Sequence, residues 1–134
     1  MKVFLVLGLA LISLQSFSAV ITKDLLPEEI QLAIRLSDKY KVPLEVRGGI
    51  CTKTEFEIVS RVRGFNPASW NLVSGENSFN LADDEVQGMI SVVNRVEAPL
   101  AILDTITTET RVVIQGASCG FNPNHWTISF DDQK

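Results

Sequence analysis

Apolar residues recur at steps of three and four in two segments, which is the spacing of one face of an α-helix. Each segment opens with acidic residues, Pro27-Glu28-Glu29 in the first and Asp83-Asp84-Glu85 in the second, as a helix N-terminus favours. Each helix should end before the next proline, because the residue before proline disfavours the α region. The first stripe is Ile30, Ala33, Ile34 and Tyr40 before Pro43, and the second is Ala82, Val86, Met89, Ile90, Val93 and Val96 before Pro99.

Alternation of apolar and polar residues after each helix predicts three antiparallel strands. The inward positions of the first strand are Leu44, Val46 and Ile50, matched later by Leu100, Ile102 and Ile106. Those of the second are Phe56, Ile58 and Val62, matched by Val112 and Ile114, and those of the third are Trp70 and Leu72, matched by Trp126, Ile128 and Phe130. The pattern predicts an α+β fold in which each sheet buries one face under its helix.

The two halves of the chain resemble each other at a fixed offset. The stretch GFNPASW at 64–70 returns as GFNPNHW at 120–126, and an ungapped alignment of 25–78 with 81–134 gives 15 identities in 54 positions. Self-similarity at one period indicates a repeated structural unit. We therefore predict that residues 19–134 form one domain of two αβββ repeats, 25–80 and 81–134, related by a pseudo-twofold axis.

The repeated stretch has a structural and a functional interpretation. Gly64 and Gly120 can adopt a positive φ angle, and the Asn-Pro pairs that follow Phe65 and Phe121 suit a tight turn. This accounts for the motif as a link between the second and third strands, the interpretation we favour. Alternatively, the two loops form a bipartite binding surface, because aromatic anchors dominate many interfaces. The residues of that surface would be Phe65, Trp70, Phe121, Asn124, His125 and Trp126.

The first 18 residues have the parts of a secretory signal peptide. Lys2 precedes an apolar run from Val3 to Ile12, and small residues stand before a predicted cut after Ser18. The run is too short to cross a bilayer, so we expect a secreted or periplasmic protein without membrane insertion once the signal is removed. In such a compartment Cys51 and Cys119 are expected to form a disulfide, with two unpaired buried thiols as the alternative.

The net charge makes two classes of partner unfavourable. Removing Lys2 leaves 11 of the 12 basic residues against 16 acidic ones, a net charge of −5, which argues against nucleic acid and anionic membranes as partners.

The outward strand positions are charged in the first half but largely apolar in the second, where they include Ala101, Leu103, Val113, Ala117 and Cys119. If nothing covers this apolar face it is a candidate interface, including one for a homodimer. The alternative is that the first half or residues 20–26 cover it.

Few residues could perform catalysis. His125 is the single histidine, and a disulfide would remove Cys119 as a nucleophile, so we expect neither a metal nor another cofactor. Asp104 is the best catalytic candidate, because alternation places it on the core-facing side of its strand, where burial would raise its pKa. The alternative is a carboxylate hydrogen-bonded to nearby backbone amides or threonine hydroxyls.

These observations favour a small binding protein with a protein partner, such as an inhibitor of another exported protein, and no enzyme activity. Two alternatives remain open. One is a small secreted hydrolase that uses Asp104, and the other is a homodimeric structural module.

Overall fold

A computed structural model describes residues 20–121 and 124–132. The signal peptide predicted at 1–18 lies outside the described residues, as do Asn122 and Pro123 of the second GFNP motif.

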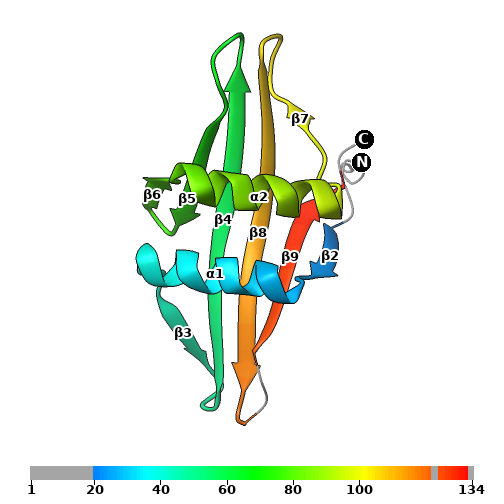
Figure 1. Cartoon of the computed structure of the whole chain (residues 1–134). Coiled ribbons are helices and arrows are strands. Elements are labelled where there is room, and N and C mark those ends of the chain that lie inside the picture. The colour runs from blue at the N-terminus through cyan, green and yellow to red at the C-terminus, as the bar shows by residue number, and fades with distance from the viewer. Residues whose placement is uncertain (1–19, 122–123, 133–134) are drawn as a thin grey trace, which may run out of the picture.

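The described chain has two layers, a single antiparallel sheet and two helices that lie across one of its faces (Figure 1). The α+β class is therefore confirmed, with one continuous eight-stranded sheet rather than two facing ones. The sheet order is β2-β9-β8-β4-β5-β6, and β3 and β7 add to the outer ends of β4 and β8. The elements are β2 (Val20–Asp24), α1 (Pro27–Lys39), β3 (Leu44–Arg47), β4 (Cys51–Arg63), β5 (Ser69–Ser74), β6 (Asn77–Asn80), α2 (Asp83–Val96), β7 (Ala101–Ile102), β8 (Thr107–Cys119) and β9 (His125–Asp131).

Both helices begin in the same way. Neither Leu26 nor Ala82, the residues before the first turn, has a side chain that can cap a helix, so a glutamate in the first turn reaches back instead. The backbone N–H of Leu26 donates to Glu29 Oε1 at 2.7 Å, and that of Ala82 donates to Glu85 Oε1 at 2.8 Å. The two glutamates are buried.

The helices run antiparallel, and ion pairs join the start of each helix to the end of the other. Arg95 donates to both carboxylate oxygens of Glu29 at 2.6 Å, and Lys39 Nζ donates to Glu85 Oε2 at 2.9 Å. Gly88 lets α2 approach α1 closely, because a Cβ at this position would lie 2.8 Å from Leu32 Cδ2.

Strands β4 and β8 form the centre of the sheet. Both have 13 residues, and they pair along their whole length, from Cys51 opposite Cys119 to Arg63 opposite Thr107. Cys51 and Cys119 are joined by a disulfide at the last rung of this ladder, as predicted. The bond covalently links the first half of the chain to the second.

Strands β2 and β6 were not predicted from the sequence. Each precedes a helix, and they pair at the two edges of the sheet, where Asp24 lies opposite Thr127 and Asn80 opposite Asn71. Both strands are short, and β6 is largely polar, so neither shows the apolar alternation that identifies a strand.

The core lies between the helices and the sheet. Residues predicted from the second and third strands, including Phe56, Ile58, Leu72, Val112, Ile114 and Ile128, are buried there against Leu36, Met89 and Val96 of the helices.

The opposite face of the sheet carries no described helix. The outward residues of the second half, Ala101, Leu103, Val113, Ala117 and Cys119, range there from half-buried to exposed, so neither the first half nor residues 20–26 cover this face.

Candidate binding surface

The long strands extend beyond the helices at both ends of the sheet and form two arms (Figure 1). The disulfide arm consists of β3, the turn 48–50, the paired ends of β4 and β8 at Cys51 and Cys119, and the following residues 120–121. The Asp104 arm consists of residues 99–106, the opposite ends of β4 and β8, and the loop 64–68. Each arm combines a strand of one half with a loop of the other.

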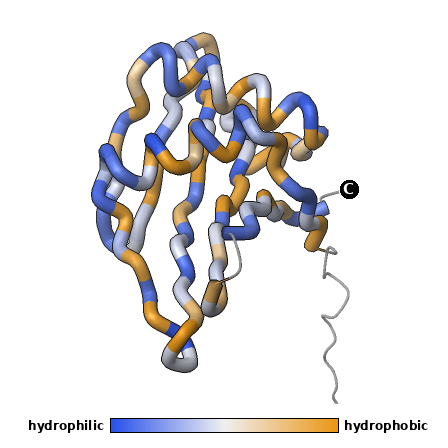
Figure 2. Tube along the Cα trace, turned by 60° about the horizontal axis from the view of Figure 1, so that its bottom comes forward, coloured by the Kyte–Doolittle hydropathy of each residue, from blue (hydrophilic) through white to orange (hydrophobic). Residues whose placement is uncertain are grey.

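The arms expose residues that the sequence pattern assigned to the core. The aliphatic side chains of the first strands are between 52% and 78% exposed, so their predicted burial is wrong. They are Leu44, Val46 and Ile50 in the disulfide arm, and Leu100, Ile102 and Ile106 in the Asp104 arm. In Figure 2 hydrophobic residues continue along the strands toward the tip of an arm, away from the helices.

Geometry explains this exposure. A strand of 13 residues is about 43 Å long at about 3.3 Å per residue. Two helices lying side by side across it cover only about 20 Å, since each is about 10 Å in diameter. The pattern correctly indicates which positions share the helix-bearing face. The two helices together are narrower than the strands are long, so the outer parts of this face stay uncovered.

The two phenylalanines of the repeated motif are fully exposed on these arms. Phe65 has a relative exposure of 109% and Phe121 of 108%. The glycine before each of them has a positive φ angle, 61° at Gly64 and 59° at Gly120, as predicted. The Gly64 N–H donates to the carbonyl oxygen of Ile106 at 2.7 Å, and the Gly120 N–H donates to that of Ile50 at 2.9 Å. These bonds place each phenylalanine beside the exposed turn of the other half.

The two tryptophans of the motif lie elsewhere. Trp126 is 5% exposed and belongs to the core, and Trp70 is partly buried against the same core. Their positions agree with the structural interpretation of this part of the motif. The two binding candidates Trp70 and Trp126 are therefore separated from the exposed candidates Phe65 and Phe121.

The two repeated motifs differ in the pair of residues before the tryptophan, which is Asn124-His125 in the second motif. This pair is exposed at the base of the disulfide arm. Asn124 and His125 both reach the surface, and His125 Nε2 lies 2.8 Å from Asp24 Oδ1. A contact between two such exposed side chains contributes little to stability. The two residues are therefore accessible to a partner.

Asp104 is not buried, contrary to the expectation for a catalytic acid. It lies in the exposed turn between β7 and β8, and its Oδ1 accepts a hydrogen bond from the Ile106 N–H at 2.9 Å. This backbone hydrogen bond lowers the pKa of Asp104 below its ordinary value. The expected burial and raised pKa are wrong, and the alternative of a carboxylate bound by backbone amides describes the turn.

The described residues hold neither of two simple features, a metal-ligand cluster and a membrane-spanning helix. The described part of the chain contains no group of three or more His, Cys, Asp or Glu side chains placed to hold a metal ion. None of its helices combines the length and the apolar character needed to cross a membrane.

Comparison with protein-family models, curated proteins and solved structures finds no match for this chain. Sequence reasoning identified Phe65 and Phe121 but assigned the six aliphatic residues of the arms to the core. The strand patterns are longer than two helices can cover, and this excess length is the signal that could have revealed the exposed positions.

Proposed function

We propose that this chain is an exported binding protein that recognises a protein partner through its two arms. One observation carries the proposal: both arms expose apolar side chains at the same four aligned positions. These pairs are Leu44 and Leu100, Val46 and Ile102, Ile50 and Ile106, and Phe65 and Phe121. The residue type is kept at all four although only 15 of 54 aligned positions are identical. Clusters of exposed apolar residues mark interaction surfaces in soluble proteins.

The shape of the arms favours a partner with a concave surface. A fully exposed phenylalanine at the end of a pair of strands can enter a pocket of the partner and lose most of its contact with water. Interfaces gain most of their energy from such desolvated residues. The four apolar side chains of one arm supply less than the roughly 800 Å² that one partner contributes to a standard interface, so the partner must also enclose the sides of the arm. Inhibition of another exported protein is one form that this function can take.

Location and origin form part of the same proposal. The disulfide between Cys51 and Cys119 supports an oxidising compartment, and together with the signal peptide predicted at 1–18 it supports a secreted or periplasmic protein. We also propose that the halves arose by tandem duplication. The pairing register supports this, because the 56-residue offset relates Arg61 opposite Ser69 to Ala117 opposite His125.

Affinity capture with a matched pair of variants tests the proposed surface. Residues 19–134 serve as bait for exported proteins of the source cells, beside a Phe65→Ser and Phe121→Ser double variant. Val20→Ser is the control, because Val20 is an exposed apolar residue outside the arms. We expect the native chain and the control to retain the same partner, and the double variant to bind at least tenfold more weakly, which corresponds to about 1.4 kcal/mol.

Sedimentation of the bait alone completes the test. The proposal is rejected if the double variant captures the partner as well as the native chain does. A native dimer that becomes monomeric in the double variant would instead assign the arms to self-association. Thermal melts should be unchanged in all three proteins, because substitutions of fully exposed residues rarely change stability by more than about 0.5 kcal/mol.

A further inference from the structure

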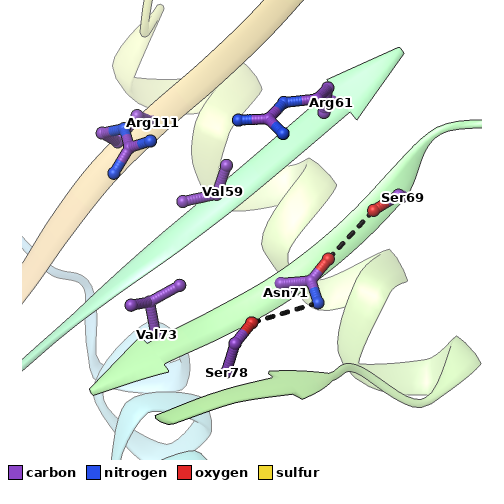
Figure 3. A pocket seen from close by; sticks show the side chains of 7 residues that line it. All are labelled: Val59, Arg61, Ser69, Asn71, Val73, Ser78 and Arg111. Atoms are coloured by element: carbon purple, nitrogen blue, oxygen red, sulfur yellow. Dashed lines mark hydrogen bonds between the residues drawn. The ribbon is translucent and has the colours of Figure 1, made fainter. Parts of the chain in front are cut away.

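The open face of the sheet contains a depression of about 360 Å³ that is separate from both arms (Figure 3). Strand pairing explains its shape. Val59 on β4 lies directly opposite Arg111 on β8 and opposite Asn71 on β5, so the three side chains stand in one row on the same face. Valine is the shortest of the three and forms the floor. Figure 3 shows Arg61 and Arg111 on one side of this floor and Ser69, Asn71 and Ser78 on the other.

The two arginines are held in place by carboxylates that lie deeper than they do. Arg61 donates to Glu109 Oε2 through Nη2 at 2.6 Å and Nε at 3.2 Å. Arg111 donates to Glu109 Oε1 through Nε at 3.4 Å and to Glu57 Oε1 through Nη1 at 2.9 Å. Nη1 of Arg61 and Nη2 of Arg111 are not used in these bonds.

The guanidinium groups of this network are more exposed than its carboxylates. The side chains of Glu109 and Glu57 are 10% and 34% exposed, whereas those of Arg61 and Arg111 are 52% and 47% exposed. Burial by itself would raise the pKa of Glu109, but the hydrogen bond from Arg61 and the charge of Arg111 lower it overall. Glu109 is thus ionised at neutral pH and fixes both guanidinium groups, while their outward sides face the solvent.

The opposite rim is a connected set of polar side chains. Ser69 Oγ donates to Asn71 Oδ1 at 2.9 Å, and Asn71 Nδ2 donates to Asn80 Oδ1 at 2.9 Å. Between this rim and the arginines, Val59 and Val73 provide an apolar strip. The depression therefore combines cationic donors on one side, an apolar floor, and neutral hydrogen-bonding groups on the other side.

We propose that this depression binds a small organic carboxylate, whose charged group lies between Arg61 and Arg111 and whose apolar body covers Val59. Guanidinium groups match carboxylates in geometry and charge. The volume is at the lower end of the range for small-molecule sites, which suits a ligand of about ten heavy atoms.

The 56-residue offset relates this site to a second place on the sheet that lacks its features. The residues aligned with Val59, Arg61 and Arg111 are Gln115, Ala117 and Glu55. The aligned place therefore has a long side chain instead of a floor, and a carboxylate instead of a guanidinium. We expect one binding site per chain, on the β4–β5 side of the sheet.

Titration of residues 19–134 with benzoate, followed by amide chemical shifts in NMR spectra, tests this inference. Benzamide is the neutral control of the same shape, and inorganic phosphate is the control for charge alone. We expect saturable shifts at Val59, Asn71 and Arg111 with benzoate in the range of about 1–10 mM. Binding of either control compound should be at least about tenfold weaker.

Three variants complete the experiment. Arg111→Gln removes one guanidinium, and Val59→Phe fills the floor while both arginines stay. Lys53→Gln is the matched control, since it removes a positive charge from the same face of β4 nearer its disulfide end, where Lys53 pairs with Glu55 at 2.7 Å. We expect the first two variants to weaken benzoate binding at least tenfold and the third to leave it unchanged.

Four results would overturn the inference. They are no saturation by about 50 mM benzoate, equal binding of benzamide or of phosphate, unchanged binding by folded Arg111→Gln, or unchanged binding by folded Val59→Phe. A melting curve for each variant establishes that it is folded. Because the exposed apolar residues of both arms are unchanged in all three variants, the outcome is independent of the proposed protein partner.

Discussion

Trp126 and Trp70 hold aligned positions in the two halves but differ in burial. Trp126 lies opposite Gly116, where an added Cβ would be 2.7 Å from the indole ring, whereas Trp70 lies opposite Ser60. The missing side chain at Gly116 gives the ring of Trp126 room to pack against the backbone. The same motif therefore contributes more to the core in the second half.

We predict that Trp126→Ala destabilises the protein by about 3–5 kcal/mol and that Trp70→Ala costs less, because less apolar surface leaves the core. Urea denaturation followed by circular dichroism measures both free energies of unfolding. The double variant Asn124→Ala with His125→Ala is the control, and its stability should change by no more than about 0.5 kcal/mol. A Trp126→Ala protein as stable as the control would show that the indole is not part of the core.

The two helices are coupled at both ends by buried glutamates. Glu29 and Glu85 each accept a hydrogen bond from the backbone N–H of the residue before their own helix. Each also forms an ion pair with a basic residue at the end of the other helix, Arg95 for Glu29 and Lys39 for Glu85. Burial alone would raise the pKa of each glutamate, but these hydrogen bonds lower it below 4.5 overall. The ionised carboxylates thus stabilise the folded state.

This arrangement predicts acid sensitivity. A carboxyl group whose pKa is lower in the folded state binds protons more readily when unfolded, so its contribution is complete above pH 4.5 and is lost as the pH falls through the folded pKa. We expect the melting temperature to fall steadily below about pH 4.5. The double variant Glu29→Gln with Glu85→Gln should be less stable at neutral pH but should show a weaker fall. An identical pH dependence in both proteins would contradict this account.

The whole molecule is tied together covalently at only one of its ends. Cys51 and Cys119 close the disulfide arm, whereas the aligned rung of the Asp104 arm is formed by Arg63 opposite Thr107. The bond closes a loop with a sequence separation of 68 residues. In the chain-entropy model, such a loop contributes on the order of 4 kcal/mol.

We predict that alkylation without a reductant leaves the mass of the mature chain unchanged, and that reduction first adds two alkyl groups. The variant Cys51→Ser with Cys119→Ser should lose stability in urea by up to about 4 kcal/mol. Hydrogen exchange should quicken at the last rungs of the disulfide arm and change less in the Asp104 arm. Two thiols that react without a reductant would disprove the bond, and equal changes in both arms would show that its effect is not local.

The local features of the fold could be predicted from the order of residues along the chain. Periodicity identified α1 and α2, and the acidic first turns and prolines marked their ends. Alternation identified the central strands and their buried residues, such as Phe56 and Ile114. Glycine at 64 and 120 predicted the positive φ angles, because few other residues adopt them easily. These features depend on neighbours in the chain, so a single sequence contains them.

Whether a face of the sheet is covered by a helix or exposed to solvent depends on the packing of the elements against one another. Alternation places Leu44 and Ile102 on the helix-bearing face, but the position and width of the helices leave them in water. The prediction that Asp104 is buried was wrong because β7 has only two residues. The chain turns before Asp104, so the alternation of a strand does not extend to it. The depression at Val59 joins residues from β4, β5, β6 and β8. Their pairing register brings these side chains together, and residues that meet only across strands leave no periodic signal along the chain.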